Sequence, residues 1–266
     1  MTDQENLTVQ PSHLLLVLFL TFFVLLFGFY AAGESENKAV MVLLECLIAL
    51  PVLVFVQVRQ LSFREIFHLR QTSLSILFYS ALIGLGTSVV AHEMEQIVQI
   101  LIPMDPEILE KVQRMLTIHS LTDGIFLIMG AVMIASVAEE MLFRGFVQGV
   151  LEKHSNVTRG VMSTALIFAV FHLNPWGFLE YMLIGVLFGV VVWKTGSIFP
   201  AVVAHGVHNL FAVVIVNTPP ERLKWYVWGD HVSPVWVAAG LAFIIFGFRS
   251  MYQITDKQSR NSAISI

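Results

Sequence analysis

The sequence predicts an all-α integral membrane protein, a polytopic bundle of about eight transmembrane helices. Three observations indicate this fold class. Hydrophobic residues make up 56% of the 266-residue chain and charged residues only 13%, against about 45–50% and about 25% in soluble domains. The mean hydropathy is +0.77. Apolar runs of roughly the 20 residues needed to cross a bilayer recur along the whole chain.

Eight apolar runs are expected to form the membrane spans. To within a few residues they lie at 12–32, 39–58, 73–102, 122–151, 157–173, 176–194, 199–217 and 232–250. The third run is interrupted by polar residues near its far end, at His92, Glu93 and Glu95. The fifth run is unusually short. A helix that ends at membrane depth must have its end buried in protein or facing a wet cavity, which predicts a water-filled pocket there.

The segment 103–117, between the third and fourth runs, is predicted to form an amphipathic helix outside the membrane. Asp105 followed by Pro106 is typical of a helix start. Apolar residues such as Ile108 and Val112 then repeat at near-helical spacing. No repeat or flexible linker divides the chain, so residues 1–266 are expected to form one membrane domain with short connections and a polar tail after Arg249.

The basic residues of the loops are distributed unevenly between the two sides of the membrane. One side would carry nine of them: Arg59, Arg64, Arg70, Lys153, Arg159, Lys194, Arg249, Lys257 and Arg260. The other side would carry five: Lys38, Lys111, Arg114, Arg222 and Lys224. The positive-inside rule therefore predicts that both termini are cytoplasmic. The N-terminal residues lack the basic region of a cleavable signal, so the first run is expected to remain as a span. The short connections favour a bacterial plasma membrane.

Composition also narrows the function classes. No basic stripe is present, so a nucleic-acid partner is not expected, and the lipid bilayer is the expected surrounding. The single cysteine, Cys46, lies in an apolar segment and is interpreted as a packed core thiol. The zinc-protease pattern HExxH and the serine-hydrolase pattern GxSxG are both absent from the sequence.

The most informative feature is an acidic pair, Glu139-Glu140, inside the fourth run. An acidic residue at the bilayer centre costs roughly 2.5–3.5 kcal/mol on insertion scales, so two adjacent acids predict a functional site. Arg144 lies four residues after Glu140, on the same helical face, which predicts an ion pair. Glu139 is turned about 100° away and has no such partner. We interpret Glu139 as the chemical residue and Glu140–Arg144 as its support, with the exchanged assignment as the alternative.

Two further spans carry polar residues at helical spacing. His172 ends the fifth run, one turn after Phe168, which is interpreted as packing. His205 and Asn209 share one face of the seventh run, as a pair that stabilises an oxyanion would. His92 and His208 are instead interpreted as hydrogen-bond partners between helices. The grouping indicates a functional site, although a proton-coupled transporter could use the same residue types.

The three groups, in this order on separate spans, resemble the motifs of the CAAX-processing and bacteriocin-processing (CPBP, or Abi) family of intramembrane endopeptidases. These motifs are Glu-Glu-x-x-x-Arg from Glu139, Phe-x-x-x-His from Phe168 and His-x-x-x-Asn from His205. The resemblance covers about 70 residues in the catalytic half, about 122–217. It implies an eight-helix bundle with a cytosol-accessible cavity that cleaves a peptide bond near the membrane. The site residues it implies are Glu139, Glu140, Arg144, His172, His205 and Asn209.

Two mechanisms for this hydrolase remain open at the sequence level. In one, Glu139 activates a water and His205 with Asn209 stabilises the oxyanion, which would make the chain a glutamate-dependent endopeptidase. In the other, His172, His205 and a glutamate bind zinc and leave a position for water, as in catalytic zinc sites, which would make it a metalloprotease. The expected partner is a peptide or protein substrate at the membrane, with a leader peptide favoured over a prenylated one.

Two other functions remain as alternatives. A membrane scaffold or immunity-type protein could keep the fold and bind a partner without cleaving it. A proton-coupled transporter could use the carboxylates as a relay, although the internal hydropathy symmetry typical of transporters is not apparent in the sequence.

Overall fold

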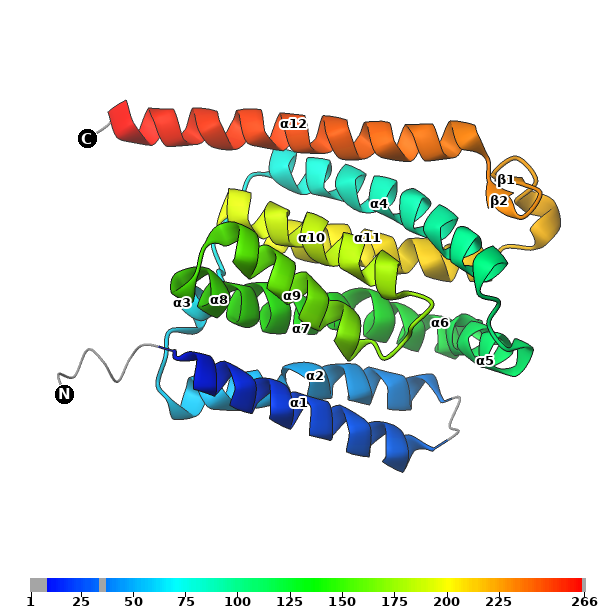
Figure 1. The fold of residues 1–266 in the computed structure, drawn as a ribbon, viewed down its shortest axis with the longest axis horizontal. Helices are drawn as coiled ribbons and strands as arrows, with labels where there is room; N and C mark the ends of the chain where they lie inside the picture. Colours follow the sequence, from blue (N-terminus) through cyan, green and yellow to red (C-terminus); the bar gives the residue numbers. More distant parts are fainter. Residues whose placement is uncertain (1–8, 34–36, 265–266) are drawn as a thin grey trace.

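The structure is a computed structural model that describes residues 9–33 and 37–264. Helices account for almost all of the regular structure, and one two-stranded hairpin joins the last two long helices (Figure 1). The elements are α1 (Pro11–Ala32), α2 (Lys38–Val58), α3 (Phe63–Ile66), α4 (Leu74–Leu101), α5 (Pro106–Leu116), α6 (Leu121–Leu127), η2 (Ile128–Ile134), α7 (Ala135–Glu140), η3 (Met141–Val147), α8 (Gln148–His154), α9 (Val157–Phe171), α10 (Phe178–Thr195), α11 (Phe199–Val216), η4 (Pro220–Arg222), β1 (Val227–Trp228), β2 (His231–Val232) and α12 (Pro234–Ile264).

The membrane helices agree closely with the eight predicted apolar runs. Among the described residues, seven helices are long and apolar enough to cross a membrane: α1, α2, α4, the continuous helix Leu121–His154, α10, α11 and α12. The eighth predicted span corresponds to α9, which is apolar but has only 15 residues. The predicted all-α polytopic bundle is therefore confirmed, with α9 too short to meet the length of a full span.

The helix Leu121–His154 is not a uniform α-helix. Two π-helical stretches, η2 and η3, flank the short α-helical segment α7 in its middle. Short π-helical insertions within α-helices are rare and frequently occur at functional sites. Here they enclose Glu139 and Glu140, which end α7. The apolar pattern of the run did not predict this local change in helical winding.

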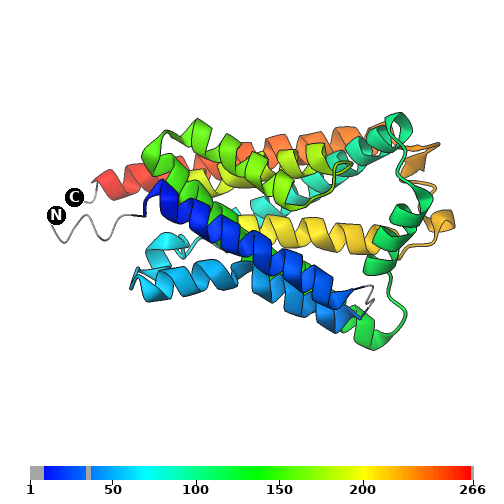
Figure 2. The same ribbon diagram turned by 60° about the horizontal axis from the view of Figure 1, so that its bottom comes forward.

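The long helices lie side by side in layers, with the acid-bearing helix near the middle (Figure 1). α1 packs on α2 at one edge of the bundle, and α12 packs on α4 at the opposite edge. α2 and α11 both pack against η2 and α7. Figure 2 shows α1 and α2 on the same side of the bundle after rotation. The acidic pair is therefore enclosed by helices that come from both halves of the chain.

Small residues bring the helices around the site close together. At Gly84 of α4, an added Cβ would overlap the backbone of Ala204 in α11. At Gly185 of α10, an added Cβ would lie 2.7 Å from Cα of Ala165 in α9. Small residues at such contacts allow the close helix packing that is typical of membrane interiors. They hold α4 close to α11 and α10 close to α9.

The predicted amphipathic helix is present as α5, and polar contacts hold its C-terminal end. Nζ of Lys38 donates hydrogen bonds to the carbonyl oxygens of Arg114 and Met115 at 2.7 and 2.6 Å. The side chain of Asn217 donates to the carbonyl of Leu116 at 2.8 Å. The C-terminal end of α5 is thus bound to the start of α2 and to the end of α11, and the chain continues from it into α6.

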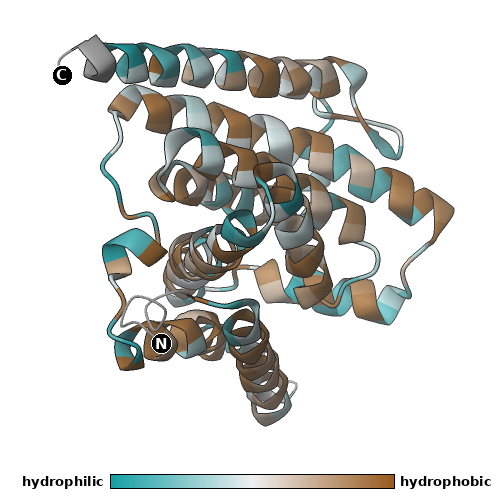
Figure 3. Cartoon of the chain, turned by 60° about the vertical axis from the view of Figure 1, so that its left-hand side comes forward, coloured by the Kyte–Doolittle hydropathy of each residue, from teal (hydrophilic) through white to brown (hydrophobic). Residues whose placement is uncertain are grey.

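The first long helix, α1, begins at the same end of the bundle at which the last one, α12, finishes. The start of α1 and the last turns of α12 both lie at the left of Figure 1, at opposite edges of the bundle. This agrees with an even number of crossings, while the side that faces the cytoplasm stays a prediction. The predicted polar tail after Arg249 is helical, because α12 continues to Ile264. Figure 3 shows that these last turns are largely hydrophilic, so they extend the helix beyond its apolar part.

Candidate active site

Glu140, Arg144 and His205 form a fully buried charged group at the centre of the bundle. Oε1 of Glu140 lies 2.9 Å from Nη1 of Arg144 and 2.9 Å from Nδ1 of His205. The side chains of Glu140 and Arg144 have no solvent exposure. By distance this is a close ion pair, although Nη1 is not aligned for a hydrogen bond with any described group. The ion pair that the sequence predicted is therefore present, and His205 adds a partner from α11.

Aromatic rings enclose the guanidinium of Arg144. Its Cζ lies 4.2 Å from the ring centroid of Phe168 and 6.0 Å from that of Phe188. Nη2 is 3.5 Å from the carbonyl oxygen of Ile184. Cations over aromatic faces are attracted by the ring quadrupole, more strongly where water is excluded. Phe168, which the sequence placed in packing, is thus also the main aromatic contact of the buried cation.

Glu139 faces two imidazole rings instead of a cation. Its Oε2 lies 3.8 Å from Nε2 of His172 and 4.0 Å from Nε2 of His205. This oxygen is buried and has no hydrogen-bond partner among the described residues. Both distances exceed a direct hydrogen bond and suit one bridging water. The two adjacent glutamates therefore have different surroundings, as the sequence predicted.

The hydrogen bonds of His172 define which of its nitrogens faces Glu139. Nδ1 lies 2.8 Å from the carbonyl oxygen of Phe168, which can only accept, so Nδ1 carries the proton. In the neutral ring Nε2 is then an acceptor that points to Glu139. The ring also stacks on Tyr181, with centroids 3.8 Å apart and planes at 24°. Two acceptors that face each other at 3.8 Å suit a donor between them.

His205 shows the same assignment of protons, with a different consequence. Its Nδ1 donates to the Glu140 carboxylate, so Nε2 is an acceptor when the ring is neutral. A neutral His205 could not donate a hydrogen bond to an oxyanion. The protonated ring could, because Nε2 then also carries hydrogen. The oxyanion role that the sequence suggested for His205 therefore requires the imidazolium form.

Asn209 lies on the same helix as His205, and its amide is held by a neighbouring backbone. Nδ2 donates to the carbonyl of Ala131, within η2, at 2.7 Å. This bond uses one of the two amide hydrogens. The contact links α11 to the π-helical stretch that precedes Glu139. A role of Asn209 as an oxyanion donor stays a prediction.

A metal site at this position would need at least three ligand side chains placed around one point. The two Nε2 atoms and Glu139 have the donor chemistry of a zinc site, and both histidines donate their other N–H group to an acceptor, as zinc ligands commonly do. However, the described residues contain no group of three or more His, Cys, Asp or Glu side chains placed to hold a metal ion. The residues as they are placed do not fit a metal, so no step below passes through one.

The remaining intramembrane histidines make contacts between helices, as the sequence interpretation expected. Nδ1 of His208 lies 3.3 Å from Oγ of Ser88, and Nε2 lies 3.5 Å from Oε1 of Glu180. His92 pairs with the hydroxyl of Tyr226 at 3.1 Å and with Gln96 at 3.0 Å. These side chains connect α4, α10, α11 and the hairpin segment.

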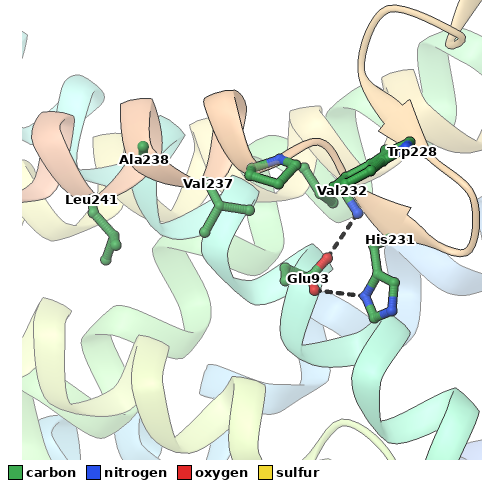
Figure 4. Close-up of a pocket in the computed structure, with 8 residues that line it drawn as sticks. Glu93, Trp228, His231, Val232, Val237, Ala238 and Leu241 are labelled. Carbon is green, nitrogen blue, oxygen red and sulfur yellow. Dashed lines mark hydrogen bonds and ion pairs between the residues drawn. The ribbon is translucent and has the colours of Figure 1, made fainter.

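Two surface hollows lie away from the motif residues. One, of about 450 Å³, is bordered by the hairpin and α12. Glu93 lines it and accepts hydrogen bonds from His231 and Val232 at 2.8 and 2.7 Å (Figure 4). The other, of about 740 Å³, lies beside the start of α6 and includes Leu121 and Met129. Neither contains a motif residue, so the predicted pocket beside His172 stays a prediction.

Sequence reasoning missed three features of the site. The π-helical stretches were not recognised. Tyr181, which supports His172 by ring stacking, was not considered, although it lies in the first turn of the next helix. Glu45, in the helix α2 that packs against α7, was not linked to the site, although its Oε2 is buried without a hydrogen-bond partner among the described residues. Its position follows from the packing of α2, and no local motif indicates it.

The bundle and the buried cluster together define an integral membrane protein with an ionisable site at its centre. Residues 121–211 match the family model described as type II CAAX prenyl endopeptidase Rce1-like. The matched segment runs from α6 into α11 and contains every motif residue. It confirms the resemblance to the CPBP family over this part of the chain and supports a CAAX-type intramembrane protease. No curated protein and no solved structure matches the chain.

Proposed function

We propose that this protein is an intramembrane endopeptidase that hydrolyses a peptide bond of a membrane-associated or leader-bearing substrate. The observation that carries the proposal is the buried oxygen of Glu139, which faces Nε2 of both His172 and His205 without a hydrogen-bond partner among the described residues. Unpaired buried polar atoms are costly, and their persistence calls for a functional explanation. The family match over residues 121–211 supports the same reaction class.

The first step is the activation of water. Oε2 of Glu139 and Nε2 of His172 are both acceptors, and one water can donate a hydrogen to each across their 3.8 Å separation. Its lone pair is then free to attack the scissile carbonyl. Glu139 removes a proton as the new C–O bond forms. This arrangement is general-base catalysis by a positioned carboxylate, which typically contributes about 10²–10⁴-fold.

The second step is stabilisation of the tetrahedral oxyanion. The Glu140 carboxylate accepts a hydrogen bond from Nδ1 of His205, and in the imidazolium form Nε2–H would donate to the oxyanion. The remaining amide hydrogen of Asn209 is the second donor. In this form the site would hold two carboxylates, Glu139 and Glu140, and two cations, Arg144 and His205. Buried charges are tolerated where they are paired in this way.

The surroundings of the substrate follow from the fold. We expect a peptide or protein segment to reach the site within the lipid bilayer of a bacterial plasma membrane, with both termini of the enzyme cytoplasmic. The nine-to-five bias of basic loop residues supports this orientation. The proposed mechanism is glutamate-dependent, because the described side chains do not form a metal-ligand group.

Substitution of the base tests the proposal. Glu139→Gln keeps the size and polarity of the side chain and removes its basicity, so cleavage should fall by about 10²-fold or more while the protein stays folded. Purified protein in liposomes would be assayed against a quenched-fluorescent peptide library. Glu180→Gln, a matched change of another intramembrane glutamate, should leave cleavage near the wild-type rate.

Each contrary result points to a different function. Full peptidase activity of Glu139→Gln would contradict the mechanism. An inactive wild type whose cellular effect survives Glu139→Gln and His205→Ala would indicate a scaffold or immunity-type protein. Substrate flux in the same liposomes without cleavage would indicate a transporter. Loss of cleavage on chelation, restored by zinc alone, would favour the metalloprotease mechanism.

A further inference from the structure

The imidazole of His172 lies against two aromatic rings. It stacks on Tyr181, with ring centroids 3.8 Å apart and planes at 24°. The ring of Phe168 lies 4.5 Å from it at 59°. The two aromatic rings are themselves 6.4 Å apart, so they contact the imidazole from two directions. Phe168 also packs on the guanidinium of Arg144, whereas the closest ring contact of Tyr181 is His172.

A tight turn between α9 and α10 leads from His172 to Tyr181. Leu173 begins it with a φ of 49°, a left-handed conformation that is strained for a residue with a Cβ. Oδ1 of Asn174 accepts hydrogen bonds from the backbone N–H groups of Trp176 and Gly177, at 3.1 and 3.2 Å. Such bonds from an asparagine side chain define a turn. Strained backbone persists only where its surroundings hold it, and it is common at functional sites.

Gly177 allows the Tyr181 ring to pack directly on the backbone of this turn. A Cβ added at Gly177 would lie 2.6 Å from Cε2 of Tyr181, closer than any real Cβ contact. The other neighbour of the ring is the imidazole of His172. The contacts thus run from the turn through Tyr181 to His172, whose Nε2 lies 3.8 Å from Oε2 of Glu139.

The stack fixes a part of the His172 geometry that its hydrogen bond does not. The bond from Nδ1 to the carbonyl oxygen of Phe168 holds one point of the imidazole, and the plane of the ring can still tilt about that point. The parallel ring of Tyr181 restricts this tilt. A tilt would move Nε2 relative to Glu139, and a misplacement of about 1 Å in a reacting geometry can lower a rate by about 10²-fold.

We propose that Tyr181 is a positioning residue of the hydrolysis, which acts through His172 by holding the plane of its imidazole. This inference rests on the proposed function, in which Glu139 and His172 together orient the attacking water. Tyr181 is not assigned a contact with the reacting atoms. Its role depends on the aromatic ring and does not require the hydroxyl group.

Substitution of the ring is the first test. Tyr181→Leu removes the stack, so kcat for the best-cleaved peptide of the library should fall by about 10²-fold. KM should stay near the wild-type value, because substrate binding keeps its contacts. Tyr181→Phe keeps the ring and should keep kcat near the wild-type value. Tyr79→Leu is the matched control, since Tyr79 is a half-buried tyrosine that packs on Phe246 at 5.7 Å, and it should change neither constant.

A double-mutant cycle tests whether Tyr181 acts through His172. In the His172→Ala background, where the imidazole is absent, Tyr181→Leu should have no further effect on the residual kcat, measured in prolonged incubations. Gly177→Ala is a second variant, which applies also if Tyr181→Leu does not fold. Gly177 has a φ of −84°, which alanine adopts, and the added Cβ would displace the Tyr181 ring. It should lower kcat and leave KM unchanged.

The outcomes separate this inference from the proposed function. Wild-type kcat in Tyr181→Leu would overturn the inference, as would an equal loss of kcat on adding Tyr181→Leu to the wild type and to His172→Ala. A loss in Tyr181→Phe as large as in Tyr181→Leu would assign the effect to the hydroxyl group and overturn it as well. In each of these cases the endopeptidase proposal stands. If wild-type protein cleaves no peptide of the library, the proposed function itself fails.

Discussion

The bundle contains two buried glutamate–histidine clusters that the sequence composition alone would not distinguish. One is the candidate active site, with Glu139 and Glu140 of α7 facing His172 and His205. The other joins α4, α10 and α11, where His208 lies between Ser88 and Glu180. Both place carboxylates and imidazoles inside helices that are apolar enough to span a membrane. They differ in how fully their polar atoms are partnered.

In the second cluster each ring nitrogen of His208 faces a partner, at 3.3 and 3.5 Å. In the candidate active site, buried oxygens of both Glu139 and Glu140 lack hydrogen-bond partners among the described residues, and a fully buried arginine balances the charge. A satisfied polar group holds helices together, whereas an unsatisfied one is available to bind or react. Whether the buried polar atoms have hydrogen-bond partners, more than the residue types, distinguishes polar packing from a reaction centre.

The largest effect is expected from Arg144, which only the first cluster possesses. Arg144→Leu leaves Glu140 as a buried charge without its cation. Loss of one partner of a buried ion pair typically costs about 3–5 kcal/mol, so the variant should unfold at a markedly lower temperature and lose cleavage. Thermal unfolding in detergent, followed by circular dichroism, measures the first effect.

The double variant Glu140→Gln with Arg144→Leu is the control for charge. Removing both partners avoids the unpaired charge, so much of the stability should return. Cleavage should stay low, because His205 loses the carboxylate that holds its Nδ1 and orients its ring. A double variant no more stable than Arg144→Leu would show that the guanidinium packing against Phe168, at 4.2 Å, carries the stability instead.

The fold could be predicted from sequence because hydropathy in a membrane is a nearly sufficient signal. Backbone groups must pair within each segment in lipid, so a long apolar run can only be a helix. The predicted bounds of α2, 39–58, differ from the observed Lys38–Val58 by one residue. The π-helical stretches could not be predicted, because the apolar pattern of the run does not distinguish π-helical from α-helical winding.

The site could be predicted only where its geometry is local. The Glu140–Arg144 pair followed from a four-residue spacing, which a helix converts into proximity. The convergence of His172 and His205 on Glu139 was expected from motif order and the family resemblance, and the structure brings these three side chains together. Glu45 has no spacing relation to the motif residues, and only the packing of α2 on α7 places its helix beside the site.

A smaller effect, confined to catalysis, is expected from Asn209. Asn209→Ala removes the proposed second oxyanion donor, and loss of one such donor typically lowers kcat by about 10²–10³-fold. KM should change little. Asn209→Asp is the matched control, because it keeps the shape of the side chain without the N–H donors. Steady-state cleavage kinetics in liposomes measure both constants.

The alternative for Asn209 is that it only anchors η2 through the carbonyl of Ala131, at 2.7 Å. In that case the loss of activity should follow a loss of thermal stability, and KM should rise together with the fall in kcat. Equal unfolding temperatures for wild type and Asn209→Ala, with a large fall in kcat, would assign the residue to the chemistry.

The smallest effect is expected in the second cluster, and it provides the sharpest check on the comparison. Interhelical hydrogen bonds in membrane proteins contribute about 0.6 kcal/mol on average. His208→Asn should therefore lower stability slightly and leave kcat for peptide cleavage near the wild-type value. His208 lies beside Asn209 in sequence, so a purely positional disturbance of α11 would be detected here. A loss of cleavage as large as that of Asn209→Ala would mean that partnering does not distinguish the two clusters, and that the catalytic centre extends to Glu180.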